Sequence, residues 1–314
     1  MMINCNIEVI VNQLKLNGID FEIIQSSPWL DNYKFASIKN VISEGIYFFE
    51  QVSIVKNFPI ENSIIIASEP FETKNNLIIV ANPQLAHYLI NAAINTVKLV
   101  GVSASTKIDD RAQIGKDVFI GENCVIGNCI IEDDVVIKHN VVVEDNVVIK
   151  KKAFIDSNSV IGAAGLAWIW DANGNRIIQP QLGGVIIGED CILATDVTIV
   201  RGSLSENTTI GKGTVIAHGT KIGHGAIVKD HVHMANNVSL AGNAVIGERT
   251  FLGSACVVSS NIKVADNCII GAGAVVNKTV EESFVTLAGV PAKVIKRANY
   301  EDKPNGAPKP FKKK

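Results

Sequence analysis

The chain has 314 residues, of which 47% are hydrophobic, and this length and composition allow one large buried core and a smaller one in a soluble globular protein. The formal net charge of -2 argues against a nucleic-acid-binding domain. No apolar run approaches the roughly 18 residues that a membrane-spanning helix requires, so we expect no stable membrane insertion.

Residues 1–98 are predicted to form a separate small α/β domain, because they lack the repeat that fills the rest of the chain. The apolar spacing before Gly18 predicts a short helix or strand, and two apolar runs at 63–68 and 77–81 predict buried strands. Residues 84–95 have the spacing of a helix, and we expect its apolar face to carry Leu85, Tyr88, Leu89 and Ala92.

Residues 99–280 carry aliphatic residues six positions apart. Neither an α-helix, whose faces repeat every 3.6 residues, nor an ordinary strand, whose faces alternate every two, requires this spacing. The hexads begin near Val102, shorten to five residues before Ile131 and before Ile210, and then run unbroken through Ile210, Ile216, Ile222, Val228, Met234, Leu240, Ile246, Leu252, Val258, Val264, Ile270 and Val276. Because each hexad supplies one short strand and one corner, the repeat predicts a parallel β-helix.

The repeat is interrupted at about 162–186. The segment AAGLAWIWDANGNRIIQPQLGG contains Trp168, Trp170 and the turn sequence Asp171-Ala172-Asn173-Gly174. We predict a loop that projects from the coil, and loops on a rigid scaffold commonly carry binding sites. The alternative is a hairpin whose aromatic residues only pack against a neighbour.

Beyond Val276 the hexads end. Residues 281–300 are predicted to form a helical segment, with a short helix after Pro291. Residues 301–314 contain Lys303, Lys309 and Lys312 to Lys314 and are predicted to be a disordered basic tail.

The six cysteines form no CxxC pair and have no zinc-like spacing with histidine. Cys124, Cys191 and Cys268 fall late in their hexads and are predicted to be small buried apolar residues. This usage favours a reducing, cytoplasmic location.

Four of the six histidines lie within one short stretch, as His218, His224, His231 and His233. His218 and His224 each follow an inward aliphatic residue by two places. They should therefore point outward on consecutive faces of one coil, and cannot share one site within a single chain. Metal ligation is the weakest interpretation, because no carboxylate or cysteine with ligand spacing accompanies them. Two other interpretations of the histidine cluster remain open, namely general-base catalysis and a solvated surface position.

An imidazole at the edge of a β-helix is suited to act as the general base in acyl transfer from a thioester. With an ordinary pKa near 6.5, neutral imidazole takes a proton from an attacking amine or hydroxyl at cellular pH. Such a base typically contributes about 10²- to 10⁴-fold to the rate. Backbone N–H groups can stabilise the oxyanion of the tetrahedral intermediate.

The repeat resembles the hexapeptide acyltransferases, whose fold is a left-handed parallel β-helix assembled as a homotrimer with active sites between subunits. KFASIKNVISEGIYFF, IIVANPQLAHYLINAA, QPQLGGVIIGED, TIVRGSL and IGHG resemble UDP-3-O-acylglucosamine N-acyltransferase of lipid A synthesis. HGAIVKDHVHMANNVSLAGNAVIGE, GAGAVVNKTV and LAGVPAKVIKR are closer to the sialic acid O-acetyltransferase and bacillosamine N-acetyltransferase group, which uses acetyl-CoA.

These resemblances imply a set of site residues. The general base aligns with His224, and His233 would lie near the acyl group of the donor. The substrate would be held by Phe48, Gln51, His218 and Asn236. The coenzyme A site would comprise Gly253, Gly271, Ala272, Gly289, Pro291, Ala292 and Lys293.

This sequence departs from both patterns. The acetyltransferases carry an acid directly after the base, where this chain has Gly225, so another group must orient the imidazole, with Asp230 or Asn236 as candidates. The lipid A enzyme holds uracil with an aromatic residue, an asparagine and a tyrosine. Only the aromatic residue is retained, as Phe48, and the other positions are Gln51 and Ile54. This disfavours a role in ordinary lipid A synthesis.

We therefore predict an N-acyltransferase that transfers an acyl group from acyl-CoA, without a metal, to the amino group of a dTDP- or UDP-linked amino sugar for surface polysaccharide, such as O-antigen, or glycan synthesis. The first alternative is the lipid A N-acyltransferase itself, which uses acyl-carrier protein. Alternatives of another class are a non-catalytic β-helix scaffold and a γ-carbonic-anhydrase-like metal protein.

Overall fold

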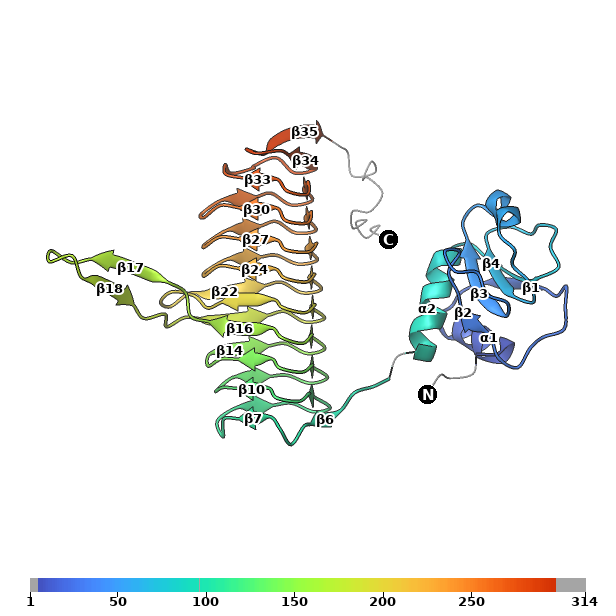
Figure 1. Cartoon of the computed structure of the whole chain (residues 1–314), viewed down its shortest axis with the longest axis horizontal. Helices are drawn as coiled ribbons and strands as arrows, with labels where there is room; N and C mark the ends of the chain where they lie inside the picture. The colour runs from blue at the N-terminus through green and yellow to red at the C-terminus, as the bar shows by residue number, and fades with distance from the viewer. Residues whose placement is uncertain (1–4, 96, 298–314) are drawn as a thin grey trace. The chain divides into compact units, whose positions relative to one another are not determined.

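The computed structural model describes residues 5–95 and 97–297, and the expected basic tail at 301–314 lies outside the described residues. The chain divides into two compact units, Met1–Lys98 and Leu99–Lys314 (Figure 1). The first is an α/β domain, and the second is a coil of short strands.

The first unit has a mixed sheet in the order β1-β5-β4-β3-β2, in which β1 runs antiparallel to β5 and the other neighbours are parallel. The first helix begins after Asn6, because the Asn6 Oδ1 accepts the Val9 N–H at 3.0 Å. The described elements are α1 (Ile7–Leu16), β1 (Phe21–Ile24), β2 (Lys34–Phe35), β3 (Gly45–Phe49), the 3-10 helix η1 (Val52–Asn57), β4 (Ile64–Ala67), β5 (Asn76–Val80) and α2 (Pro83–Asn95).

The helix α2 buries a different face from the one that we expected. Its buried residues are Pro83, Ala86, His87, Ile90 and Ile94. Leu85 and Tyr88, expected on the apolar face, are 49% and 59% exposed. Both sets follow helical spacing, so periodicity alone allowed either face. Packing against β3 and β4 selected the face that includes His87, whose Nε2 lies 3.3 Å from the carbonyl oxygen of Ile46.

The second unit consists of three parallel sheets, which we call faces 1, 2 and 3 in the order in which each coil visits them. Face 1 contains β6 (Gly101–Val102), β9 (Phe119–Ile120), β12 (Val136–Ile137), β15 (Phe154–Ile155), β20 (Ile192–Leu193), β23 (Val215–Ile216), β26 (His233–Met234), β29 (Phe251–Leu252), β32 (Ile269–Ile270) and β34 (Val285–Ala288). Face 2 contains β7 (Lys107–Ile108), β10 (Val125–Ile126), β13 (Val142–Val143), β16 (Val160–Ala163), β21 (Thr198–Val200), β24 (Lys221–Ile222), β27 (Ser239–Leu240), β30 (Val257–Val258) and β33 (Val275–Val276). Face 3 contains β8 (Gln113–Ile114), β11 (Ile130–Ile131), β14 (Val147–Ile149), β19 (Gly184–Ile187), β22 (Asn207–Ile210), β25 (Ile227–Val228), β28 (Val245–Ile246) and β31 (Lys263–Val264).

The hexad residues form the core of this coil, which confirms the predicted parallel β-helix. Ile216, Met234 and Leu252 pair in register on face 1, and all three are fully buried. The first expected five-residue step falls between β10 and β11 and leaves the register intact, because Ile131 still pairs with Ile149. The second, before Ile210, is wrong: the chain takes 11 residues from Ile199 to Ile210, whereas the next coil takes 6 from Ile222 to Val228, so the segment is an inserted loop. Many corner residues have positive φ and are Asn or Asp, the non-glycine residues that tolerate a left-handed backbone best.

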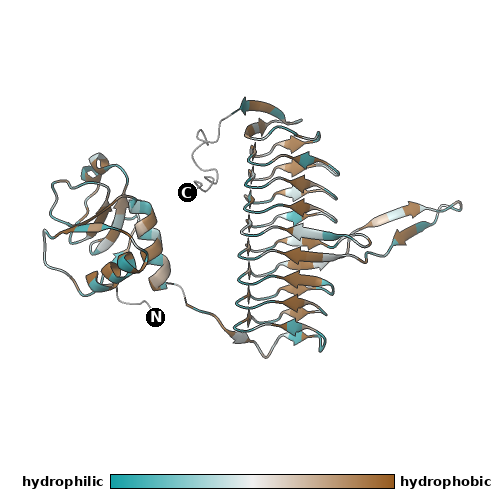
Figure 2. Cartoon of the chain, turned by 180° about the vertical axis from the view of Figure 1, so that it is seen from behind, coloured by the Kyte–Doolittle hydropathy of each residue, from teal (hydrophilic) through white to brown (hydrophobic). Residues whose placement is uncertain are grey.

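The interruption of the repeat is an antiparallel hairpin of β17 (Ala167–Trp170) and β18 (Arg176–Gln179). We call residues 164–183 the arm. It leaves the coil after β16 and returns at β19, and it projects away from the coil (Figure 1). Both strands contain hydrophobic residues (Figure 2), and the side chains of Trp168, Ile169 and Ile178 are 49%, 67% and 56% exposed. The arm therefore presents an apolar surface that its own chain leaves uncovered.

The C-terminal segment is not helical within the described residues, so the expected short helix after Pro291 is wrong. β34 continues face 1, and β35 (Lys293–Arg297) folds back antiparallel on β34 after a turn at Gly289, where φ is +93°. The β-branched residues of the VTLA strand favour extension. Pairing with β35 satisfies the free edge of β34, which a helix would not do.

Candidate functional site

The edge where face 2 passes to face 3, which we call the 2–3 corner, collects the irregular features of successive coils. The arm leaves here between β16 and β19, and the loop 201–206 lies here between β21 and β22. His224 follows β24 at the same corner, and Gly242 follows β27 one coil further on. Loops and polar residues therefore gather at one edge of an otherwise regular coil.

His224 is half-buried at this corner, and both edges of its ring have neighbours. Its Nδ1 lies 3.0 Å from the hydroxyl oxygen of Ser203. Its Nε2 lies against Gly242, where an added Cβ would collide with Nε2 and would stand 2.7 Å from Cε1. The imidazole thus occupies space that exists because residue 242 has no side chain.

The loop 201–206 is held by hydrogen bonds that place Ser203. The Glu206 carboxylate accepts the backbone N–H of Ser203 at 2.6 Å and that of Leu204 at 3.1 Å. These bonds, together with the carboxylate's bond to its own backbone N–H, hold the pKa of Glu206 below its ordinary value. The arm contributes as well, because the Leu182 N–H donates to the Ser203 carbonyl at 3.0 Å.

The position after His224 has no room for an acid. Gly225 has φ of +63°, and a Cβ built there would collide with the side-chain oxygen of Asn243 on the next coil. The two expected orienting residues lie elsewhere. Asp230 follows β25 on face 3 and accepts the Lys212 N–H at 2.8 Å, and Asn236 follows β26 on face 1.

The edge where face 1 passes to face 2, the 1–2 corner, carries a second set of expected site residues. His218 lies there, exposed, with its Nδ1 2.8 Å from the Thr195 hydroxyl. The remaining members of this column on later coils are Asn236, Gly253, Gly271, Ala272 and Gly289. Pro291, Ala292 and Lys293 follow in the terminal turn, where the Ala292 N–H donates to the Val275 carbonyl at 2.8 Å.

His233 lies on face 1 and is half-buried. Its ring meets Phe251 of the next coil edge-on, with centroids 5.2 Å apart. Burial lowers the pKa of His233 below its ordinary value of 6.5, which favours the neutral imidazole. His233 is the first residue of β26, and the 1–2 corner begins directly after this strand. Within one chain, face 2 separates the 1–2 corner from the corner that carries His224.

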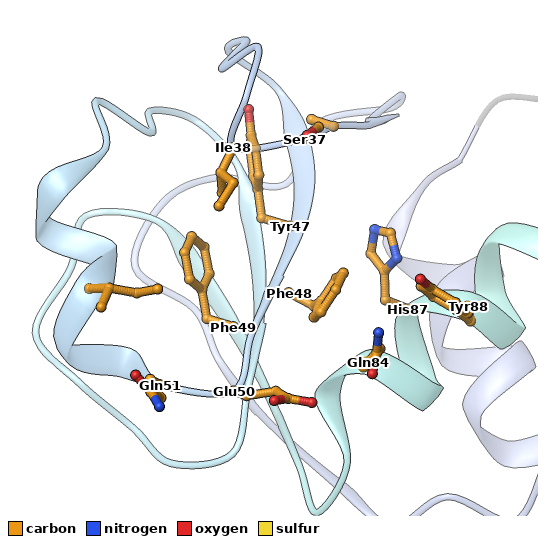
Figure 3. A pocket seen from close by; sticks show the side chains of 12 residues that line it. Ser37, Ile38, Tyr47, Phe48, Phe49, Glu50, Gln51, Gln84, His87 and Tyr88 are labelled. Carbon is orange, nitrogen blue, oxygen red and sulfur yellow. The ribbon is translucent and has the colours of Figure 1, made fainter. Parts of the chain in front are cut away.

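The first unit contains a pocket of about 590 Å³ that brings together the residues expected to hold a nucleotide base. Phe48 and Gln51 line it with Ile54, and Figure 3 shows Phe48 on its strand facing His87 and Tyr88 on α2. The centroid of the Phe48 ring lies 4.9 Å from that of the His87 ring and 6.2 Å from that of the Tyr88 ring, which it meets edge-on.

We also searched residues 5–95 and 97–297 for a metal site, a reactive cysteine and a membrane-spanning helix. No group of three or more His, Cys, Asp or Glu side chains is placed to hold a metal ion there. All six cysteines are free and buried, and burial raises the pKa of Cys191 to about 11 and that of Cys256 to about 12, which makes them poor nucleophiles. Among the described residues no helix has the length and apolar character needed to cross a bilayer.

Sequence reasoning missed several residues of these sites. Ser203 and Glu206 lie in an inserted loop between Ile199 and Ile210, and the break in the six-residue spacing before Ile210 was the available signal. His87 lies on the buried face of α2, whereas the predicted apolar face of this helix carried Leu85 and Tyr88. Gly242 carried no signal, because glycine is common at the corners of the repeat.

Comparisons with known proteins bear on the repeat and the fold. Residues 243–278 match the family model for the bacterial transferase hexapeptide (six repeats), and residues 111–151 match that for the hexapeptide repeat of succinyl-transferase. In solved structures, LpxA from Acinetobacter baumannii shares 26% identity, with a TM-score of 0.55 over 62% of this chain and 72% of that one. UDP-N-acetylglucosamine O-acyltransferase from Moraxella catarrhalis shares 25%, with a TM-score of 0.56 over 62% and 73%. The chain thus carries hexapeptide repeats and has the left-handed parallel β-helix fold of these acyltransferases.

Among curated proteins, it resembles UDP-3-O-acylglucosamine N-acyltransferase. The Coxiella burnetii enzyme is 29% identical over 51% of this chain and 53% of its own length. The Polynucleobacter asymbioticus enzyme is 30% identical over 39% and 34%. The chain therefore spans about half the length, or less, of these relatives.

Proposed function

We propose that this protein is an N-acyltransferase that acylates the amino group of a nucleotide-linked amino sugar. The observation that carries the proposal is the half-buried His224, whose Nδ1 meets Ser203 and whose Nε2 lies against Gly242. A histidine held in this way has the Nε2 lone pair available for general-base catalysis.

The reaction follows from this geometry. The amine attacks the thioester carbon, and Nε2 of His224 accepts the proton that the nitrogen releases. We assign the backbone N–H of Gly242, which lies one coil beyond His224 at the same corner, to the oxyanion of the tetrahedral intermediate. When the intermediate collapses, the C–S bond breaks, the proton passes to the leaving thiolate, and an amide and a free thiol result.

We place the acyl-CoA donor at the 1–2 corner. Gly271 is half-buried and Ala272 is exposed at this corner, so both are available to line a pantetheine chain, whereas Gly253 is buried against the next coil. The turn from Gly289 to Lys293 closes the C-terminal end of the column. Lys293 supplies a positive charge for a phosphate there, and His233 and Asn236 face the acyl group and the sugar from neighbouring positions.

A homotrimer completes the proposed site. Within one chain His224 and the donor column lie on different corners, so a second copy must bring its 1–2 corner to the 2–3 corner of the first. The exposed apolar arm leaves from the 2–3 corner and supports this assembly, because an apolar surface of this kind marks a contact with a partner. The buried free thiols are compatible with a reducing cytoplasm.

The sugar nucleotide would use the pocket of the first unit. Phe48 offers an aromatic face for a base, and Gln51 offers amide groups for its polar edge. The UDP-3-O-acylglucosamine N-acyltransferases named above support a second candidate, in which the donor is an acyl-carrier protein carrying a long chain and the product enters lipid A synthesis.

One experiment separates these functions. The purified protein is incubated with UDP- and dTDP-linked amino sugars and with acetyl-, 3-hydroxybutyryl- and longer acyl-CoAs, and products are identified by mass. Acylation with a CoA thioester, lost by about 10²- to 10⁴-fold in His224→Ala, is the expected result. Acylation only with acyl-carrier protein would select the lipid A reaction. No transfer with any donor would leave the β-helix a scaffold, and full activity in His224→Ala would refute His224 as the general base.

A further inference from the structure

Ser203 meets His224 on the side of the ring away from Gly242. We infer that Ser203 is a positioning residue that sets the tautomer and the orientation of His224, in the role that an acid directly after the base would have. This inference rests on the proposed function, because it assigns a role to a residue behind the proposed base. Ser203 does not touch the reacting atoms.

The structure holds Ser203 more firmly than a surface loop would. Glu206 accepts the Ser203 N–H at 2.6 Å, and Leu182 of the arm donates to the Ser203 carbonyl at 3.0 Å. Gly183 donates to the Gly202 carbonyl at 3.1 Å, so the base of the arm and the loop 201–206 are joined by two backbone hydrogen bonds. Both backbone groups of Ser203 are thus fixed, and its hydroxyl is directed at His224.

The backbone of His224 is fixed in the same way. Its carbonyl accepts the Asn243 N–H at 2.8 Å, and the following Gly225 N–H donates to the Thr208 hydroxyl at 2.9 Å. With both partners held, the 3.0 Å contact between Ser203 Oγ and His224 Nδ1 orients the ring. A hydroxyl can donate or accept, and the inferred arrangement is the one in which the Ser203 oxygen accepts from Nδ1–H. When Nδ1–H donates to the hydroxyl oxygen, Nε2 keeps its lone pair and can act as the base.

A hydroxyl differs from a carboxylate in a way that can be measured. It accepts the Nδ1–H bond but carries no charge, so it orients the ring without the electrostatic stabilisation that an acid gives to the imidazolium. A carboxylate at residue 203 would add that stabilisation. It would therefore move the acidic limb of the pH–rate profile to higher pH without a change in fold.

The test uses four variants of the full chain: Ser203→Ala, Ser203→Thr, Ser203→Asp and Ser205→Ala. Ser205 is exposed in the same loop, so Ser205→Ala is the matched control for removing one hydroxyl. We expect Ser203→Ala to lower kcat about tenfold or more with little change in KM, since groups that orient a catalytic histidine act on the transition state. Ser203→Thr should retain activity, Ser203→Asp should shift the acidic limb upward, and Ser205→Ala should behave as the unaltered protein.

A second readout does not depend on activity. ¹⁵N NMR of the histidine rings, with the His224 signal assigned from His224→Ala, reports which nitrogen is protonated. The Nδ1–H form should dominate in the unaltered protein and Nε2–H should gain population in Ser203→Ala. An unchanged kcat together with an unchanged tautomer in Ser203→Ala would overturn the inference. A changed tautomer in a protein that acylates no sugar would overturn the proposed function and leave the role of Ser203 in place.

Discussion

The Nε2 edge of His224 rests against Gly242, the residue one coil further along the same corner. Gly242→Ala tests this relationship directly. The added methyl group would collide with Nε2 and stand 2.7 Å from Cε1, so the imidazole must turn away from its place beside Ser203. We expect kcat to fall by about 10²-fold or more, because displacing a general base forfeits most of its contribution.

The cause of that loss is checked by a double-mutant cycle. Adding His224→Ala to Gly242→Ala removes the colliding ring, so the Tm lost in Gly242→Ala should be largely recovered in the double variant. Additive losses of Tm would contradict the close approach of residue 242 to the ring.

The acid sensitivity of the β-helix should include a contribution from His233. Burial lowers its pKa in the folded state below the ordinary 6.5, so between these two values the unfolded chain binds more protons. The free energy of unfolding should therefore decrease as pH falls through 6.5, and His233→Gln should flatten this decrease. Urea unfolding followed by circular dichroism at several values between pH 7.5 and pH 5 measures the effect. Parallel curves for the two proteins would show that His233 is not responsible.

The arm should be needed for assembly but not for folding. Ile169 is 67% exposed on β17, and Ile169→Glu places a charge in an apolar surface that we propose is covered by another copy. Sedimentation should show association weakened roughly tenfold or more, with the circular dichroism spectrum unchanged.

Asn173→Ala at the exposed tip of the arm is the matched control, and it should leave association unchanged. An unaltered protein that remains monomeric at all concentrations would refute the assembly itself.

The pocket of the first unit should govern the affinity for the sugar nucleotide alone. Phe48→Leu keeps an apolar side chain in the core but removes the aromatic face. Because stacking of a base on an aromatic ring contributes about 1–3 kcal/mol, KM for the sugar nucleotide should rise about 5- to 160-fold. KM for the acyl donor and kcat should change little. Leu85→Ala on the exposed side of α2 serves as the control, and an equal effect of both variants would argue against a base in this pocket.

Some features follow from local sequence alone. The inward positions Ile216, Met234 and Leu252 could be read from the hexads, because each short strand repeats the same environment and its register is fixed by periodicity. The same periodicity predicts that His218 and His224 point outward on consecutive faces, and the structure has them at consecutive corners. Strands 63–68 and 77–81 were visible as apolar runs, since central parallel strands are buried on both sides.

Other features were decided by tertiary packing. The face of α2 that contains His87 was chosen by the sheet, and the C-terminal strand β35 was chosen by the free edge of β34, neither of which local spacing reports. The contact between Ser203 and His224 depends on how the arm and the inserted loop 201–206 stack on the next coil. Periodicity determines what lies inside a repeat, whereas a site at its corner is built from the irregular segments, whose positions only the assembled coil fixes.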